Sequence, residues 1–328
     1  MKFLKVGFVI FGMAFLASIP SAFSCDLCSI YIASQAEGKS AQGLTVSGAE
    51  QFTHFSTLQK DGVNVPNEVG QYLDSSISQF MFSYPVTGNL RLQLNIPYIH
   101  RVFRRPENFR NGSGEGTNIV HGAESGLGDV SLIGNFTVYR GGAEDFAFVW
   151  QWVGGMKFPT GNTSRLGEEL NEIDVEGAPE SGIHGHDLTL GSGSFDGMVG
   201  TYASVRWKGF FLDANVQYSI RTKGDFYYQF ANDLAWSGGP GGYLFLEHEF
   251  TVAFQAHVSG GSKGEDSFQN QRTSDTTITA VYLGPRFIGT WRDCLSADLG
   301  VDFPLSIDNT GFQAVPDYRV QAAISWHF

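Results

Sequence analysis

The sequence predicts an all-β protein, a transmembrane up-and-down antiparallel β-barrel of about twelve strands that is preceded by a cleaved signal peptide. Three observations lead to this prediction. Apolar and polar residues alternate with a period of two through almost the whole chain after residue 43. The alternating segments are long, and short connections alternate with long ones between them. The composition, with 41 Gly and 28 Phe among 328 residues, is unusual for a soluble globular domain.

The first residues predict export. MKFLK supplies a basic region and VGFVIFGMAFLASI an apolar stretch. Ala22 and Ser24 then supply the small residues at the −3 and −1 positions that favour cleavage before Cys25. A membrane anchor is disfavoured because the apolar stretch is shorter than the ~20 residues of a spanning helix. Acylation of Cys25 is the other alternative. We therefore expect a signal peptide at 1–24, a periplasmic segment at 25–43 and the barrel at 44–328.

The charge of the chain excludes one class of partner. The formal net charge is −12, and it becomes about −14 once Lys2 and Lys5 leave with the signal peptide. Nucleic-acid binding needs a basic surface, so no nucleic-acid partner is expected.

The alternation predicts strands with one apolar and one polar face. In FFLDANVQYSIR, the even positions from Leu212 to Ile220 are apolar or aromatic, and the odd positions from Asp213 to Arg221 are polar. NLRLQLNIPYIHR, GDVSLIGNFTVY and LSADLGVDF repeat this pattern. A soluble sandwich could bury the apolar faces. However, the segments commonly exceed the five or six residues that are typical of globular strands, which favours a membrane barrel.

Twelve strands are expected at 44–58, 73–87, 90–104, 126–140, 145–158, 195–208, 209–223, 228–246, 250–262, 276–291, 295–307 and 316–328. Tight turns are expected at 88–89, 141–144, 208–209, 247–249 and 292–294. The connections between them are 59–72, 105–125, 159–194, 224–227, 263–275 and 308–315, and all except 224–227 are long. Short periplasmic turns and long outer loops are typical of outer-membrane barrels, so both ends of the chain should lie on the periplasmic side.

Lipid offers no hydrogen bonds, so the last strand must pair with the first. In RVQAAISWHF this places Val320, Ala322 and Ile324 against lipid, with Trp326 and Phe328 at the periplasmic interface. The polar faces should line the lumen, and the residues predicted to do so are Arg91, Gln93, Asn95, Asp129, Asn135, Asp213, Asn215, Gln217, Arg221, Asp298, Asp302 and Arg319. Their opposite charges could pair and close the lumen or line a wet path.

Several segments resemble a known family. GLGDVSLIGNFTVYR, VGGMKFPTGN and LGSGSFDGMVGTYASVRW, followed by FFLDANVQYSIRTKGDFYYQFANDL, are similar to a family of outer-membrane transporters named for the MetA pathway of phenol degradation. The resemblance implies a barrel channel for small molecules, including hydrophobic or aromatic ones. The terminal Phe328, with Trp326 two residues before it, resembles the signal that the outer-membrane assembly machinery reads.

Cys25 and Cys28 form a CxxC pair in the predicted periplasmic segment. A local disulfide is the simplest interpretation. A soft metal site is the alternative, and Cys294 could be a third ligand or pair with either cysteine. Covalent haem attachment is excluded because Ser29, rather than His, follows the second cysteine.

Two other clusters suggest chemistry. In the long connection at 159–194, His184, His186 and Asp187 could bind a divalent cation, although such charged runs are more often solvated loops. His257 and Ser259 have the spacing found in outer-membrane phospholipases, but Gly260 follows the serine where those enzymes have Asn, and the strand parity points both side chains into the lumen.

We therefore predict a non-enzymatic outer-membrane channel for passive uptake or efflux of small solutes, with no cofactor. Its expected partners are the solute, the lipid bilayer and, through Phe328, the assembly machinery. The alternatives are a structural or binding barrel with a plugged lumen, and a metal-linked barrel that uses the CxxC. The oligomeric state is left open.

Overall fold

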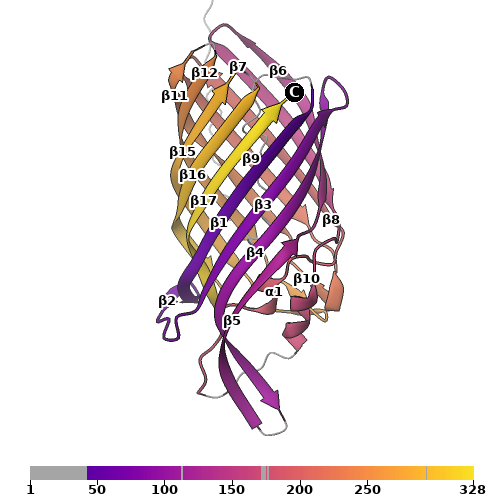
Figure 1. Cartoon of the computed structure of the whole chain (residues 1–328), viewed down its shortest axis with the longest axis vertical. Coiled ribbons are helices and arrows are strands. Elements are labelled where there is room, and N and C mark those ends of the chain that lie inside the picture. The colour runs from indigo at the N-terminus through magenta and orange to yellow at the C-terminus, as the bar shows by residue number, and fades with distance from the viewer. Residues whose placement is uncertain (1–42, 112–113, 171–174, 176, 248, 293) are drawn as a thin grey trace, which may run out of the picture.

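The protein is described from a computed structural model, which covers residues 43–111, 114–170, 175, 177–247, 249–292 and 294–328. Its wall is a closed barrel of antiparallel strands (Figure 1). The wall strands are β1 (Thr45–Lys60), β3 (Tyr72–Pro85), β4 (Leu90–Asn111), β6 (Ser131–Ala143), β7 (Phe146–Lys157), β8 (Asp196–Trp207), β9 (Phe210–Ile220), β11 (Asp233–Leu246), β12 (Phe250–Lys263), β15 (Ile278–Trp291), β16 (Leu295–Asn309) and β17 (Phe312–His327). None of the helices in the described ranges is both long and apolar enough to cross a membrane.

The first and last strands close the barrel, as predicted. β1 pairs with β17 from Thr45 opposite His327 to Lys60 opposite Phe312. The seam contains an irregularity near Phe55, where Asp317 accepts hydrogen bonds from the backbone N–H of Ser56 (2.6 Å) and from its hydroxyl (2.8 Å). The prediction of twelve wall strands is confirmed.

The strands alternate between the two faces of the wall, also as predicted. In β9, the side chains of Leu212 and Val216 are 52% and 40% exposed, whereas Asn215 and Gln217, the two neighbours of Val216 in the chain, are buried. In β17, Ile324 and Trp326 are exposed and Gln321 is buried. The exterior is therefore apolar and the interior polar, which is the reverse of a soluble protein and is the arrangement that a lipid environment requires.

One part of the exterior departs from this rule. Glu50 of β1 is only partly buried on the outward face, and its carboxylate accepts hydrogen bonds from Ser76 and Ser78 of β3. Farther along the same strands, His54 Nδ1 lies 2.6 Å from Asp74 Oδ1. These outward polar groups are paired with one another across β1 and β3, which limits the cost of placing them on an otherwise apolar surface.

The outer connections contain more regular structure than predicted. The predicted loop at 105–125 is wrong, because β4 continues to Asn111 and forms a hairpin with β5 (Gly114–Leu127). The predicted strand at 126–140 begins only at Ser131, since the wall strand is interrupted between β5 and β6. Among the described strands, β5 pairs with β4 alone.

A second small sheet lies in the outer connections. β10 (Tyr228–Gln229) pairs with β13 (Ser267–Phe268), which pairs with β14 (Gln271–Arg272). The prediction of a short connection at 224–227 followed by a strand from 228 was wrong, because η4 (Asp225–Tyr227) and β10 precede β11. The connection is therefore long, like the other outer ones. A further short strand, β2 (Val63–Val65), extends the edge of β1.

The two ends of the barrel differ. The C-terminus lies at one end, while β2, β10, helix α1 (Gly185–Leu188) and the β4–β5 hairpin gather at the other (Figure 1). Phe328 N–H donates to Leu44 O (2.9 Å) at the first end, where the tight turns also lie. We call this the periplasmic end and the opposite one the outer end, following the usual asymmetry of such barrels. The predicted signal peptide, Cys25 and Cys28 lie outside the described residues.

Candidate functional site

The connection between β7 and β8 folds into the outer end of the barrel. We call its described part, residues 158–170, 175 and 177–195, the mouth segment. It contains the 3-10 helix η3 (Ser164–Leu170) and the short helix α1. The sequence predicts this stretch as an outer loop, but the structure buries much of it, with Leu166 and Leu188 fully buried.

Apolar side chains fix the mouth segment against the wall. Ile183 and Leu188 form a buried cluster with Phe55 of β1, Leu73 of β3 and Phe103 of β4. Leu190 forms another cluster with Ile77 and Ile99 of the same two wall strands β3 and β4. The inward face of these strands is therefore apolar near the outer end, where the simple alternation predicts polar lumen residues.

Hydrogen bonds tie the mouth segment to both sides of the seam. Ala314 N–H of β17 donates to Gly182 O (2.7 Å). From β4, Arg101 donates to Thr189 O (2.6 Å) and Arg105 to Ile183 O (3.1 Å). These contacts hold the segment within the barrel mouth rather than above it.

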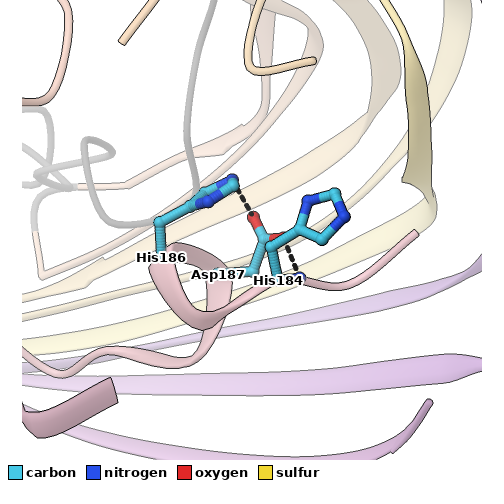
Figure 2. Close-up of side chains that lie close together, drawn as sticks. All are labelled: His184, His186 and Asp187. Carbon is cyan, nitrogen blue, oxygen red and sulfur yellow. Dashed lines mark hydrogen bonds and ion pairs between the residues drawn. The ribbon is translucent and has the colours of Figure 1, made fainter. Parts of the chain in front are cut away.

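The predicted metal-binding residues lie in this segment and are close together. His184, His186 and Asp187 approach one another at the turn that forms α1 (Figure 2), and their possible ligand atoms all lie within 4.8 Å of one another. His186 Nδ1 is 2.9 Å from Glu169 Oε1, and His186 Nε2 is 3.5 Å from Asp187 Oδ1. Both histidines are buried, so the expectation of a solvated loop is wrong for this part of it.

The charges of this cluster are strongly coupled. Burial lowers the pKa of His186, but the charges of Asp187 and Glu169 outweigh that effect and raise it to about 10. Burial raises the pKa of Glu169, but the charge and hydrogen bond of His186 lower it to about 2. At neutral pH the His186 imidazole is therefore protonated and lies between the carboxylates of Glu169 and Asp187.

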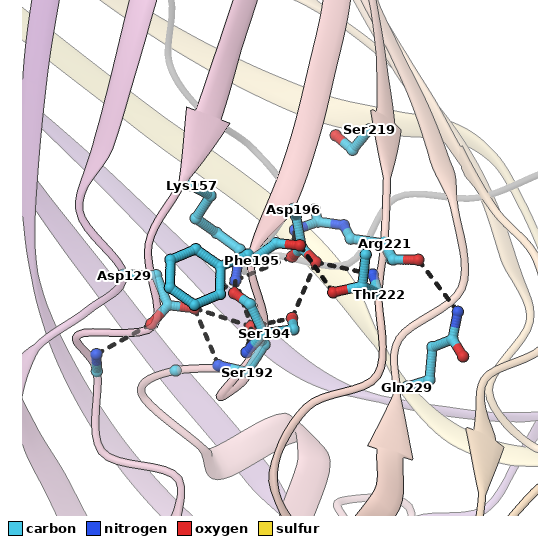
Figure 3. A network of polar contacts seen from close by, with 12 residues as sticks. Asp129, Lys157, Ser192, Ser194, Phe195, Asp196, Ser219, Arg221, Thr222 and Gln229 are labelled. Carbon is cyan, nitrogen blue, oxygen red and sulfur yellow. Dashed lines mark hydrogen bonds and ion pairs between the residues drawn. The ribbon is translucent and has the colours of Figure 1, made fainter.

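A second cluster holds the two ends of the mouth segment. Lys157, the last residue of β7, lies with its Nζ 2.5 Å from Asp129 Oδ2 and 2.9 Å from Asp196 Oδ2 (Figure 3). Arg221 continues the series, 3.0 Å from Asp196 and 2.7 Å from Asp233 Oδ2. We call these five residues the ion-pair network. All five side chains are at most 8% exposed, so each charge depends on its partners.

The network also binds the backbone of the mouth segment. Asp129 accepts hydrogen bonds from Gly161 N–H (2.9 Å) and from Ser192 N–H (3.0 Å). A Cβ on Gly191 would lie only 2.7 Å from Asp129 Oδ1 and from Gly161 Cα, so both glycines allow the two chain passes to cross beside the carboxylate. Three of the segments that carry the family resemblance therefore meet at the Asp129 carboxylate, namely GLGDV, KFPTGN and GSGSFDG.

A cavity of about 60 Å³ lies inside the barrel beside the network. Asp129, Lys157 and Arg221 contribute charged groups to its lining, and Ile99 and Met198 contribute apolar ones. The cavity therefore offers both an apolar wall and ionic groups to a small molecule or to water.

The predicted lumen residues point inward. All of them except Arg91 have buried side chains, and Arg91 is partly buried, with its guanidinium donating to Thr45 Oγ1 (3.2 Å). Several charges pair between wall strands, such as His257 Nδ1 with Asp302 Oδ1 at 3.1 Å. The predicted lumen residues therefore fall into two groups. Asp129 and Arg221 belong to the ion-pair network, whereas most of the others line the lumen.

His257 and Ser259 face the lumen, as predicted, and both contact the same carboxylate. The Ser259 hydroxyl donates to Asp302 Oδ2 (3.2 Å), and His257 Nδ1 lies 3.2 Å from that oxygen. A serine nucleophile needs its hydroxyl against a base that takes the proton, usually a histidine. Here the hydroxyl is directed to Asp302 instead, so the pair lacks the arrangement of a hydrolase.

Cys294 lies in the turn between β15 and β16 at the periplasmic end. It forms no disulfide with any residue that the structure describes, and its Sγ is 3.4 Å from Trp291 O. Its predicted pairing with Cys25 or Cys28 involves residues outside the described part of the chain and stays a prediction.

No family model matches the chain, and no curated protein matches it either. The likeness to known proteins comes from solved structures. The COG4313 outer membrane channel from Pseudomonas putida F1 superposes with a TM-score of 0.59 at 13% identity, over 89% of this chain and 98% of that one. The fold is that of an outer-membrane β-barrel. At this identity the likeness shows the fold alone, and the MetA-pathway resemblance stays a prediction.

Other outer-membrane barrels are more distant. The β domain of the Bordetella autotransporter BrkA has a TM-score of 0.42 at 9% identity, over 88% of this chain and all of that one. The translocator domain of NalP from Neisseria meningitidis has a TM-score of 0.41 at 11% identity, over 90% and 92%. These two values are too low to support an argument about this chain.

The ion-pair network and the apolar contacts of the mouth segment were not predicted from the sequence. A signal for the second was present, since Leu73, Ile77, Ile99 and Phe103 are apolar at inward-facing positions. An apolar inward residue in a water-filled barrel needs a partner that covers it. For the network, Lys157 and Asp196 flank the longest connection, but their pairing depends on how that connection folds.

Proposed function

We propose that this chain is a passive channel of the outer membrane for small solutes, and that the mouth segment controls entry from the outer end. The observation that carries the proposal is the combination of a closed wall, apolar outside and polar inside, with one connection folded into the mouth. A wall of this kind fits a bilayer, and a polar lumen fits a path for solutes.

The lumen below the mouth segment is suited to water. Oxygen atoms of Asn95, Asn135, Asn215 and Gln217 are buried and accept no hydrogen bond from the described residues. Buried polar atoms normally have a partner, and water is the usual one where protein groups do not supply it. These side chains come from the three strands β4, β6 and β9, and water along the lumen would satisfy them.

The lining of the cavity beside the ion-pair network indicates which class of solute could bind there. Ile77, Leu190 and Phe230 give it an apolar side, and Lys157 and Arg221 a charged one. A small molecule with a hydrophobic or aromatic body and one polar group would fit both sides. This agrees with the resemblance to transporters of the phenol-degradation family, and it leaves the identity of the solute to experiment.

Assembly at the outer membrane is part of the proposal. Phe328 is 71% exposed at the periplasmic end and stands next to Trp326, with ring centroids 6.4 Å apart. We infer that the assembly machinery binds this terminal strand. Deleting Phe328 should reduce the amount of barrel in the outer membrane while export to the periplasm continues, as measured by fractionation. Normal assembly of the deletion variant would contradict this role.

The alternative is a barrel that does not transport. The mouth segment favours it, because apolar clusters and hydrogen bonds hold this segment inside the outer end. Planar-bilayer recordings separate the two functions. The mature chain is refolded and compared with a variant in which residues 164–188 are replaced by a short Gly-Ser linker. Reproducible openings of the unmodified chain support the channel.

Openings of the linker variant alone would mean that the mouth segment is a permanent plug, and silence of both would mean that the lumen itself is closed. Either result would overturn the proposal of a passive channel. Heat-modifiable migration of both proteins in gels serves as the control for a folded barrel.

A further inference from the structure

The cluster at α1 has a composition that the channel function does not use. It contains two imidazoles and one carboxylate within residues 184–187 of the mouth segment, from His184, His186 and Asp187 (Figure 2). Nitrogen and oxygen donors of these types are ligands of zinc and related divalent ions. The two histidines are 7% and 5% exposed, which is unusual for side chains of an outer connection.

The donor distances agree with a shared ion. His186 Nε2 and Asp187 Oδ1 are 3.5 Å apart, which is long for a hydrogen bond. Two ligands of a tetrahedral zinc ion, each ~2.0–2.1 Å from the metal, are separated by about 3.3 Å. Small side-chain adjustments would therefore bring both atoms to one ion. His184 lies on the other side of Asp187, with its ring centroid 5.4 Å from that of His186.

The surroundings of His186 supply an outer shell. Its Nδ1 lies 2.9 Å from Glu169 Oε1, and the same oxygen accepts the backbone N–H of His186 (2.8 Å). A carboxylate on the second ring nitrogen is the usual support of a metal-binding histidine, since it fixes the ring and directs the other nitrogen to the metal. Here that other nitrogen is Nε2, which faces Asp187.

Space and charge also suit a cation. His186 and Asp187 line a cavity of about 50 Å³, enough for water molecules to complete the coordination. Asp275 Oδ2 is 3.8 Å from His184 Nδ1 and adds a third carboxylate near the cluster. Lys263, which also lines the cavity, pairs with Asp266 at 2.6 Å.

We propose that His184, His186 and Asp187 bind a divalent transition-metal ion of the zinc type, with Glu169 as the outer-shell partner of His186. The ion would join both ends of the α1 turn and hold it in the folded mouth segment. Because the ion would bind this arrangement and not an unfolded segment, it would stabilise the folded mouth segment.

The test is zinc binding by the full mature chain, refolded in detergent and freed of metal with EDTA. Cys25→Ser and Cys28→Ser are introduced first, because the CxxC pair could bind zinc itself. Calorimetric titration with zinc, and separately with magnesium, should give one zinc ion per chain and no magnesium binding, since magnesium prefers oxygen ligands.

Four variants define the site. His184→Ala, His186→Ala and Asp187→Asn should each weaken zinc binding at least tenfold, and Glu169→Gln should weaken it about 10–100-fold, as loss of an outer-shell partner does. His121→Ala is the matched control, because His121 is an exposed histidine of β5, and it should leave binding unchanged.

Absence of zinc binding, or equal binding by the parent and the His186→Ala variant, would overturn the proposal. Heat-modifiable migration verifies that each variant is folded. If an alanine variant does not fold, the nearly isosteric Asp187→Asn and Glu169→Gln variants decide the question by the same measurement.

Discussion

The periplasmic half of the lumen is lined mostly by polar side chains such as Ser83 and Ser325, with one small apolar cluster of Ala49, Met81 and Ala323. The outer half contains the apolar clusters that hold the mouth segment. In the outer half, Leu190 packs on Ile77 and Ile99 in the same way that residues pack in a soluble domain. The first half follows from a period-two pattern on each strand. The second half depends on one connection that returns into the barrel, so the two halves can be changed independently.

The largest expected effect comes from removing the apolar half. Replacing residues 164–188 by a Gly-Ser linker deletes η3 and α1 but leaves every wall strand intact. We expect a several-fold higher single-channel conductance than that of the unmodified chain, because the polar half then sets the resistance. Planar-bilayer recording measures it, and an unchanged conductance would show that the polar half limits flow already.

The ion-pair network joins the two halves, so breaking it should have the next largest effect. Lys157→Met leaves Asp129 and Asp196 buried beside an uncharged side chain, and breaking a buried pair costs about 3–5 kcal/mol. We expect more frequent openings and faster amide hydrogen exchange at residues 189–195. Lys208→Met, at a tight periplasmic turn, is the control and should change neither measurement.

The packing of the apolar half can be tested with a substitution that creates a cavity in it. Leu190→Ala removes a buried side chain from its cluster with Ile77 and Ile99, and such changes cost about 2–5 kcal/mol. Part of that cost should destabilise the mouth segment in its folded position, which planar-bilayer recording would show as a higher open probability of the channel. Leu212→Ala on the lipid face is the matched control, since Leu212 is 52% exposed and lies outside the lumen. Equal effects of the two substitutions would contradict the role given to Leu190.

The smallest effect should be a pH dependence confined to the outer half. The pKa of His186 is raised to about 10, so its stabilisation is complete below its unfolded value of about 6.5 and is lost as the pH rises through 10. The pKa of Glu169 is lowered to about 2, so its stabilisation is present above about 4.5 and is lost as the pH falls toward 2.

In EDTA, open probability should therefore rise at both extremes of pH and be lowest between about 4.5 and 6.5. His186→Gln should remove the alkaline rise, and His121→Gln should retain it. An alkaline rise that persists in the His186→Gln variant would place the titrating group elsewhere.

The wall could be predicted from the sequence because each strand repeats one local rule. The alternation places every side chain of β9 from Leu212 to Ile220 on the correct face, and the predicted pairing of the last strand with the first is confirmed. The β4–β5 hairpin was missed because its polar, glycine-containing sequence is also typical of a loop.

The mouth segment could not be predicted in the same way. Lys157 and Asp196 are adjacent only because the chain between them folds inward, and no periodicity encodes that path. The segment's histidines were identified as a group from their spacing, but their burial depends on Ile183 and Leu188 finding apolar positions on three wall strands. Such long-range packing leaves only an indirect trace, namely apolar residues at inward positions.

The seam between β1 and β17 has a consequence for how the barrel forms. The Thr45 hydroxyl and His327 Nδ1 lie 3.0 Å apart although 282 positions separate them in the sequence. Contacts of such large separation form late, because the entropy of closing the loop must be overcome first. Until then the edges of β1 and β17 expose unpaired backbone groups, which can pair with other chains. The interval before closure is therefore when this chain is most prone to aggregate.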